Sequence, residues 1–206
     1  MPPKAKPRSK ANSPAGALRL RYRPATKARW EDLVELFGPN GGCAGCWCMW
    51  WRVSAREWNN GKGAGNRRAL RKLVATGAVP GILAYHQGRP VGWCAVGPRE
   101  DFPRLDGSRV LARVDDAPVW SIACLFVASP YRRRGVSEFL VRSAAAYASL
   151  RGATIVEAYP KDVEGEQPDA FVWTGMAGAF RKAGFVEVAR RSPTKPVMRL
   201  RVGDVR

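Results

Sequence analysis

VWSIACLFVASPYRRRGVSEFLVRSAAAYASLRGATIVEAY, residues 119–159, is the stretch that decides the fold. Both of its ends are rich in apolar and β-favouring residues, as is typical of strands covered on both faces. Between them, apolar residues recur at helical spacing, at Val136, Leu140, Ala144 and Tyr147, and Gly152 ends the helix. A strand, a turn, a helix and a second strand form a βαβ unit, so this stretch predicts two parallel strands joined by a helix.

Further strands and helices are expected on both sides of this unit. The expected elements are a strand at 18–23, helices at 26–37 and 66–76, a strand pair at 81–98, a helix ending at Gly184, and strands at 185–189 and 197–202. Ser54 and Glu57 have the spacing of a capping box, whereas residues 98–108 read as loop. The order βααββ, βαβ, αββ predicts an α/β fold, a single domain with a mixed sheet and flanking helices.

Length and composition bound the class of protein. With 206 residues, of which 46% are hydrophobic, the chain can bury one core but is short for two domains. No apolar run approaches the length of a membrane span, and residues 1–17 lack the apolar segment of a secretory signal. We therefore expect a cytoplasmic monomer or homodimer without membrane contact, in which residues 1–17 are a disordered basic arm and residues 18–203 form the domain.

The charge balance is strongly basic. There are 35 lysines and arginines against 17 acidic residues, a formal net charge of +18. Such an excess attracts phosphate, whether in nucleic acid, on a membrane surface or in a phosphorylated cofactor. Arginine far outnumbers lysine and Ala, Gly and Pro are abundant, which also fits compositional drift from GC-rich coding. A nucleic-acid partner is thus the less favoured explanation of the charge.

The turn of the βαβ unit crowds three arginines, Arg132, Arg133 and Arg134, before Gly135. The first N–H groups of the following helix have no helical partners and lie at the positive end of its dipole. Gly135 lets the backbone approach an anion closely, and Ser137 is small enough not to block it. The turn therefore predicts a bound pyrophosphate, and the alternative is a solvated arginine cluster at a helix start.

Residues 121–152 resemble the central motif of the GNAT acyltransferases, in which a strand is followed by Q/R-x-x-G-x-G/A and a long helix. Arg132, Gly135 and Ser137 occupy the three motif positions, and Ser137 departs from the usual Gly or Ala. The segment FRKAGFVEV is similar to the family's late junction between helix and strand. The resemblance implies a central splayed pair of parallel strands and acetyl-coenzyme A as the cosubstrate.

The resemblance also implies which residues bind that cosubstrate. The pyrophosphate would lie on the turn residues Arg132, Arg133, Arg134, Gly135, Val136 and Ser137. The pantetheine arm and the acetyl oxygen would be bound by backbone groups of Leu125, Phe126 and Val127, where the two strands part.

Proton transfer is where the sequence departs from the family pattern. Many relatives have a tyrosine acid where this chain has Phe180, and some have a glutamate base where it has Ser121. Ser121 could hold a water, and the substitutes considered for the acid are Tyr159 and Cys124, with Glu157 and His86 as more distant options. Tyr159 is equally well explained as an aromatic residue that packs at a strand end.

A cysteine-rich segment, GCAGCWCMWWR, lies between the first two expected helices. Cys43, Cys46 and Cys48 invite a metal site, but structural zinc usually takes four ligands, and Cys94 and Cys124 lie in strands expected to be interior. We expect no metal. In the family, the first two helices form one wall of the acceptor groove, and this segment joins them. Trp47, Trp50 and Trp51 are therefore candidates for an aromatic acceptor pocket, with Arg52 at its edge. Packing of the tryptophans in the core is the alternative.

Three functions follow from these features. The first is an acetyl-coenzyme A-dependent N-acetyltransferase that transfers the acetyl group directly to a primary amine of a small molecule or peptide. The second is acetylation of an aminoacyl-tRNA, which the basic composition motivates. The third is a binding module with a degenerate acyl site, motivated by Phe180 and Ser137.

Overall fold

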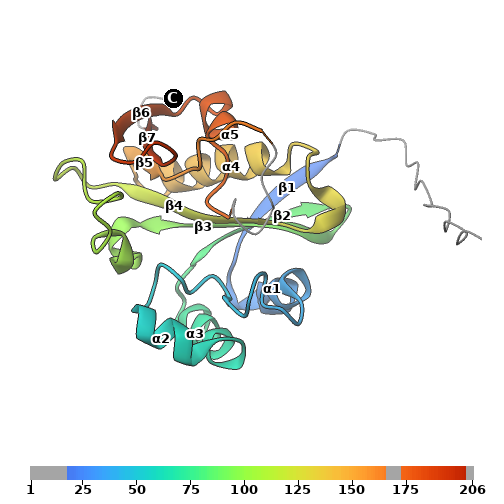
Figure 1. Cartoon of the computed structure of the whole chain (residues 1–206). Coiled ribbons are helices and arrows are strands. Elements are labelled where there is room, and N and C mark those ends of the chain that lie inside the picture. Colours follow the sequence, from blue (N-terminus) through green and yellow to red (C-terminus); the bar gives the residue numbers. More distant parts are fainter. Residues whose placement is uncertain (1–17, 166–172, 203–206) are drawn as a thin grey trace, which may run out of the picture.

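The computed structural model describes residues 18–165 and 173–202, which form a seven-stranded sheet with helices on both faces (Figure 1). The strand order is β1-β2-β3-β4-β5-β7-β6. The strands are β1 Leu20–Pro24, β2 Gly81–His86, β3 Arg89–Pro98, β4 Trp120–Val127, β5 Ile155–Ala158, β6 Val186–Arg190 and β7 Pro196–Arg201. β4 and β5 run parallel, and the other neighbours run antiparallel. The prediction of a mixed-sheet α/β fold is confirmed.

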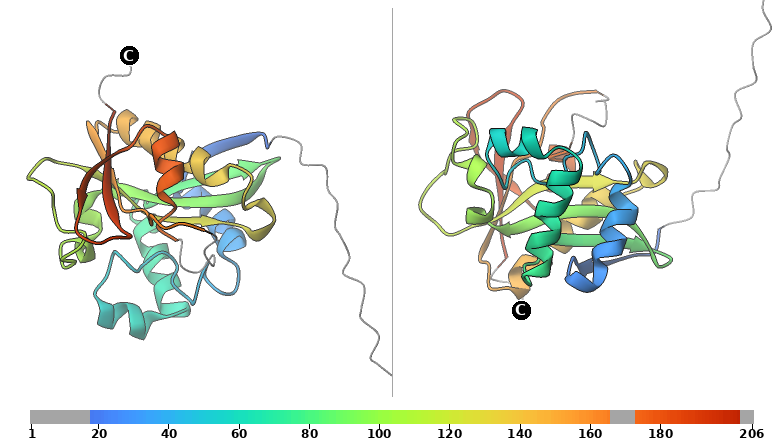
Figure 2. Two further views of the ribbon diagram at one scale, coloured as in Figure 1. Left: turned by 45° about the horizontal axis from the view of Figure 1, so that its top comes forward. Right: turned by 90° about the horizontal axis from the view of Figure 1, so that it is seen from below.

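The helices divide between the two faces of the sheet. α1 (Trp30–Phe37), α2 (Ala55–Gly61) and α3 (Ala64–Ala75) lie below it in Figure 1 and in front of it in the right view of Figure 2, whereas α4 (Val136–Leu150) and α5 (Ala177–Lys182) lie on the opposite side. Short 3₁₀ helices are η1 Lys27–Arg29, η2 Arg99–Asp101, η3 Pro103–Leu105 and η4 Ser129–Tyr131. Each face therefore buries its own hydrophobic core.

The βαβ unit forms as expected, and its two strands part early. β5 pairs with β4 only from Trp120 to Ile122. Ala123 is an extra residue in β4, because Ala95 of β3 pairs with Cys124 while the next residue of β3 pairs with Ile122. A bulge of this kind bends the strand that carries it, so β4 leaves β5 just after the bulge and the pair is splayed.

The ends of several elements follow the local signals in the sequence. Ser54 and Glu57 make both bonds of a capping box at the start of α2, and Gly184 follows α5 with a φ of +91°. The expectation of plain loop at residues 98–108 is wrong, because this segment contains η2 and η3. The side chain of Arg99 is buried there and holds the segment against the sheet.

Some predictions fall on parts of the chain outside the described residues. These are the basic arm at residues 1–17 and the end of the domain at residue 203. Among the helices of residues 18–165 and 173–202, none is long and apolar enough to span a membrane.

Candidate functional site

A cavity of about 830 Å³ opens where β4 leaves β5. Its walls come from the end of β4, the turn before α4, α5, the segment before α5, and the loop after α1. Predicted residues that line it are Leu125, Phe126, Val127, Arg132, Arg133, Gly135, Val136 and Ser137. The structure thus brings together all the predicted cofactor-binding residues except Arg134, which does not line the cavity.

The turn before α4 presents backbone donors to this cavity. Gly135 is the N-cap residue of α4, with a φ of +81°, and Arg133 also has a positive φ of 57°. The N–H of Phe139 makes the first helical bond, 3.0 Å from the Gly135 carbonyl. The N–H groups of Val136, Ser137 and Glu138 therefore have no helical carbonyl to bind, which is the general condition of a helix start. Such amides bind phosphate oxygens readily.

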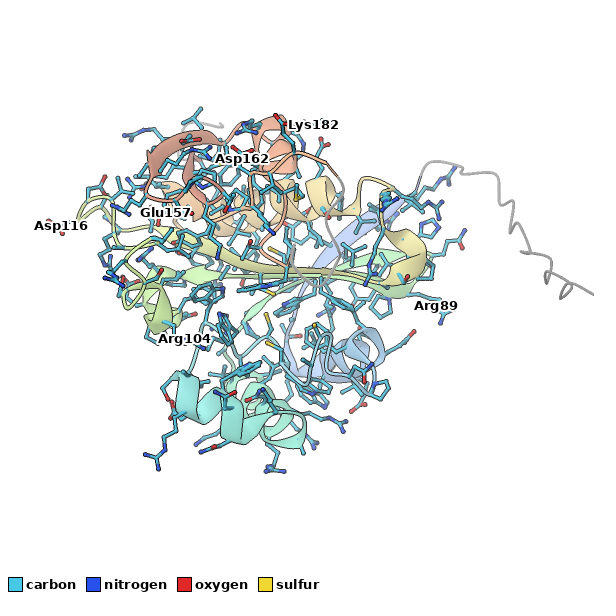
Figure 3. The ribbon with its side chains drawn as sticks, in the orientation of Figure 1. Arg89, Arg104, Asp116, Glu157, Asp162 and Lys182 are labelled. Atoms are coloured by element: carbon cyan, nitrogen blue, oxygen red, sulfur yellow. The ribbon has the colours of Figure 1, made fainter. Side chains whose placement is uncertain are left out.

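The space and the charge at this turn both fit a diphosphate. A Cβ atom placed on Gly135 would meet no protein atom within 4 Å, so the backbone is open to a ligand at this point. Arg132 donates from Nε to the Val127 carbonyl at 3.0 Å, which fixes the turn against the end of β4. Lys182 of α5, which is labelled in Figure 3, lines the cavity as well. Cations and helix amides that converge on one open cavity suit a phosphorylated ligand.

The backbone of β4 is less open than the resemblance implied. The Leu125 N–H donates to the Trp173 carbonyl at 2.6 Å, so the protein itself occupies that donor. Phe126 pairs with Trp93 of β3, and because backbone groups alternate in direction along a strand, its N–H faces β3 and not the cavity. The Val127 amide is then the backbone donor of β4 that faces the splayed side.

Trp173 connects the cavity with a cluster of tryptophans. Its indole lines the cavity and lies 5.7 Å from the ring of Trp51 and 6.3 Å from that of Trp50. Trp50 in turn makes an edge contact with Trp58 at 4.9 Å. An aromatic wall thus extends from the cavity on the α1–α3 side of the sheet. Trp173 was missed in the sequence because its neighbourhood has no periodic pattern.

Three of the four residues expected in the acceptor pocket, Trp47, Trp51 and Arg52, have buried side chains. Trp47 is buried and stacks with Trp30 at 6.1 Å. Arg52 stacks on Phe102 at 4.4 Å and donates to the Pro80 carbonyl at 2.8 Å. None of the four residues lines the cavity, and Trp50 and Trp51 are connected to it only by their ring contacts with Trp173, which does.

The hydroxyls considered for proton transfer lie in a buried network. The Tyr159 hydroxyl donates to Glu157 Oε1 at 2.7 Å, lies 2.8 Å from Ser121 Oγ, and accepts from Arg99 Nη1 at 2.7 Å. Burial, and then the charge of Glu157, raise the pKa of Tyr159 well above its usual range. Neither Tyr159 nor Ser121 lines the cavity. The geometry does not favour them as acid or base, since the phenol keeps its proton.

None of the other residues named in connection with proton transfer lines the cavity. Phe180 is fully buried and packs edge-on against Phe185 at 5.3 Å. His86 lies at the end of β2, with its ring 6.0 Å from that of Tyr131. Cys124 is half-buried on the face of the sheet that packs against α1–α3.

Metal binding finds no geometric support in the described residues. Within residues 18–165 and 173–202, no three His, Cys, Asp or Glu side chains gather in a way that could hold a metal ion. Cys43 is exposed and lines the mouth of the cavity, whereas Cys48 lies against β3. The expectation of a metal-free protein stays a prediction.

The chain also matches known proteins. A family model described as the acetyltransferase (GNAT) family matches residues 45–170, more than half of the chain. The chain belongs to the GNAT acetyltransferase family. No curated protein matches the sequence of this acetyltransferase. Its identification as an acyltransferase enzyme of the GNAT type, with acetyl-coenzyme A as cosubstrate, is confirmed.

Solved GNAT structures share the fold at low sequence identity. One is the PaiA N-acetyltransferase of Thermoplasma acidophilum in complex with coenzyme A, with 11% identity, a TM-score of 0.50, and 89% of this chain and 99% of that chain covered. A GNAT acetyltransferase of Streptococcus agalactiae has 11% identity, a TM-score of 0.51, and 89% and 96% coverage. The Drosophila melanogaster polyamine N-acetyltransferase has 13% identity, a TM-score of 0.50, and 88% and 99% coverage.

Proposed function

We propose that this GNAT enzyme binds acetyl-coenzyme A in the cavity beside β4 and transfers the acetyl group directly to a primary amine of a small molecule or peptide. The observation that carries the proposal is the open turn at Gly135, where helix amides, Arg132, Arg133 and Lys182 line one cavity that reaches the parting strands. When bound, acetyl-coenzyme A supplies the acetyl thioester. The chain's part is to hold its diphosphate at residues 132–137 and its arm beside Val127.

The acceptor would approach along the aromatic wall that begins at Trp173. Several tryptophan faces of this part of the protein are already covered by its own cations. The Arg104 guanidinium lies 3.8 Å from the ring centre of Trp50, and the Lys62 ammonium lies 4.6 Å from that of Trp58. Figure 3 shows Arg104 on the α1–α3 side of the sheet. Added cationic charge would be repelled there. This favours an aromatic or peptide-like amine over a polyamine.

The Trp173–Leu125 bond bears on how the donor binds. The family resemblance places the pantetheine arm of acetyl-coenzyme A beside the Leu125 N–H. In this structure that N–H donates a hydrogen bond to the Trp173 carbonyl at 2.6 Å. We propose that Val127 contributes the backbone donor to the arm. A role for Leu125 requires the Trp173 carbonyl to move.

A cytoplasmic location stays an expectation.

The test is an acetylation assay on three proteins, with an amine panel of aromatic amines, short peptides, polyamines and charged tRNA. The wild type should acetylate aromatic or peptide amines faster than polyamines, as measured by product mass. Gly135→Val should lose activity and at least about tenfold in coenzyme A affinity, measured by calorimetry, because its side chain enters the space of the phosphates.

Gly152→Val is the matched control. Gly152 lies beyond the opposite end of α4, has a φ of +87°, and has the same open surroundings as Gly135. Its replacement imposes similar backbone strain and should leave coenzyme A affinity unchanged. Equal affinity in the two variants would place the donor elsewhere. Acetylation of tRNA alone would overturn the small-amine assignment.

A further inference from the structure

Helix α3 carries a concentration of positive charge that acetyl transfer does not use. Its sequence, AGNRRALRKLVA, contains Arg67, Arg68, Arg71 and Lys72 and no acidic residue. The chain has no Asp or Glu at all in residues 58–99. The four cations form two pairs four residues apart, and like charges at this spacing repel each other along a helix. The helix is thus weakened by its own charge, and a bound anion would relieve the repulsion.

The charged side of α3 faces solvent. All four cations are exposed, whereas the apolar side of the helix, at Leu70 and Val74, is buried in the core below the sheet. In the right view of Figure 2, α3 lies in front of the sheet, and no other element of the described chain covers its outer face. This face is therefore open to a large ligand.

The cations of α3 differ from arginines elsewhere in the structure because they lack acidic partners. Arg190 lies 2.6 Å from Asp162, and Arg199 lies 2.6 Å from Asp115. Within residues 18–165 and 173–202, by contrast, no carboxylate forms an ion pair with a cation of α3. Compositional drift raises the number of arginines along the whole chain, but it gives no reason for one helix to be left without carboxylates. The local arrangement therefore supports a function for this charge.

Two of the arginines lie over tryptophan rings. The Arg67 guanidinium is 5.3 Å from the ring centre of Trp47, and the Arg71 guanidinium is 5.9 Å from that of Trp30. Such contacts restrict a guanidinium without neutralising its charge. Trp30 begins α1 directly after η1, so the second contact also places the exposed Lys27 of η1 on this side of the molecule. We name Lys27, Arg67, Arg68, Arg71 and Lys72 the basic surface.

The chemistry of the basic surface distinguishes between candidate partners. A helix that binds a membrane inserts apolar side chains, and the centre of a protein interface is rich in apolar and aromatic residues. The exposed large apolar side chains of the described residues are Leu150, Val186 and Val188, none of which belongs to α3. Exposed cations without such neighbours are typical of contacts with a phosphate backbone.

We propose that the basic surface binds the sugar–phosphate backbone of a nucleic acid without reading its base sequence. Lysine and arginine side chains that contact phosphates release condensed counterions, so the affinity falls as salt rises. α3 and α4 lie on opposite faces of the sheet (Figure 1), so the nucleic acid and coenzyme A would bind at separate sites. The proposal does not rest on acetyl transfer and would stand if the acceptor assignment failed.

The experiment measures binding of the full-length protein to labelled oligonucleotides by fluorescence anisotropy over a range of salt concentrations. The probes are a single-stranded RNA of mixed sequence and a duplex DNA of the same sequence, and their relative affinities identify the source of the backbone. Arg68→Gln together with Lys72→Gln should lose about tenfold in affinity and flatten the slope of log affinity against log salt. The slope should change by about 1.4 for the RNA and about 1.8 for the duplex, because two phosphate contacts are lost.

Lys195→Gln together with Arg201→Gln is the matched control. Both side chains are exposed at the β6–β7 end of the sheet, and this variant also loses two positive charges. It should retain the wild-type affinity and slope. Equal losses in the two variants, or a wild type that binds neither probe at low salt, would overturn the proposal. Displacement of the RNA by coenzyme A would place it in the cavity, and equal competition by polyglutamate would indicate an acidic protein partner; either result would also overturn it.

A measurement on the wild type makes the test independent of how the variants fold. Lysines are modified with an N-hydroxysuccinimide ester in the presence and absence of the RNA, and the modified peptides are quantified by mass spectrometry. The RNA should protect Lys27 and Lys72 and leave the modification of Lys195 unchanged. Equal protection of the three lysines, or protection of Lys195 alone, would contradict the basic surface as the binding site.

Discussion

At the scale of single residues, Arg99 makes the densest set of buried contacts described above. Its guanidinium donates to Asp106 Oδ1 at 2.9 and 3.0 Å, to Glu157 Oε1 at 2.9 Å, and to the Leu111 carbonyl at 2.9 Å. Glu157 is fully buried and also accepts from Arg199 Nε at 2.7 Å. One arginine thereby fixes the segment after β3 and neutralises a carboxylate inside the sheet.

Arg99→Met is expected to destabilise the protein by about 3 kcal/mol, because the buried Glu157 loses one of its two cationic partners. Urea denaturation measures the free energy of unfolding. Arg89→Met is the matched control, since its contact with Glu35 is exposed and 3.4 Å long, and such pairs contribute at most about 1 kcal/mol. Equal losses in the two variants would show that the network is not stabilising.

At the scale of elements, Asp162 joins α5 to β6. Its carboxylate accepts from Arg181 of α5 at 2.8 and 3.1 Å and from Arg190 of β6 at 2.6 Å (Figure 3 labels Asp162). The bonds from Arg181, and then from Arg190, lower the pKa of Asp162 to about 2. The carboxylate is therefore more acidic in the folded chain than in the unfolded one.

This link should make stability depend on pH in the acid range. A depressed pKa contributes stability above the unfolded value of about 4, and the contribution is lost as the pH falls toward 2. Thermal unfolding of Asp162→Asn between pH 5 and pH 2 should show a shallower fall in midpoint than the wild type, and salt should reduce the difference. Asp116→Asn, in an exposed loop, should retain the wild-type profile; an equally shallow fall there would contradict this role for Asp162.

The elements themselves could largely be predicted from the sequence, because their signals are local. The apolar spacing of α4, the capping box at Ser54 and the turn at Gly135 each depend on a few neighbouring residues. Contacts between distant segments could not be predicted in this way. Nothing near Arg99 in the chain indicates that Tyr159 receives its hydrogen bond, and nothing near Leu125 indicates that the Trp173 carbonyl occupies its amide.

The same distinction holds within the candidate site. Residues 132–137 could be proposed because a helix start offers phosphate-binding amides regardless of tertiary context. The acceptor side was less predictable, because a tryptophan in a loop can pack in the core or line a groove. Trp47 and Trp51 pack in the core, and Trp50 and Trp51 contact Trp173, which lines the cavity.

At the scale of the whole molecule, the formal net charge of +18 should act on any phosphorylated ligand. We expect the affinity for coenzyme A to fall about tenfold between low salt and ~1 M salt, because the screening length shortens from roughly 10 Å at 0.1 M to about 3 Å. Calorimetry at several salt concentrations measures this. Pantetheine, which lacks the phosphates, is the control and should show little change; parallel salt dependence of both ligands would exclude an electrostatic cause.

The bulge at Ala123 of β4 means that the cavity is opened by the backbone and not by particular side chains. Every amino acid except proline carries the same backbone N–H and C=O groups, so an opening made by a bulge and by the first amides of a helix depends little on the side chains around it. Val136, for example, buries its side chain in the core while its amide lies at the helix start that lines the cavity. Solved structures with the same fold share only 11–13% of their residues with this chain.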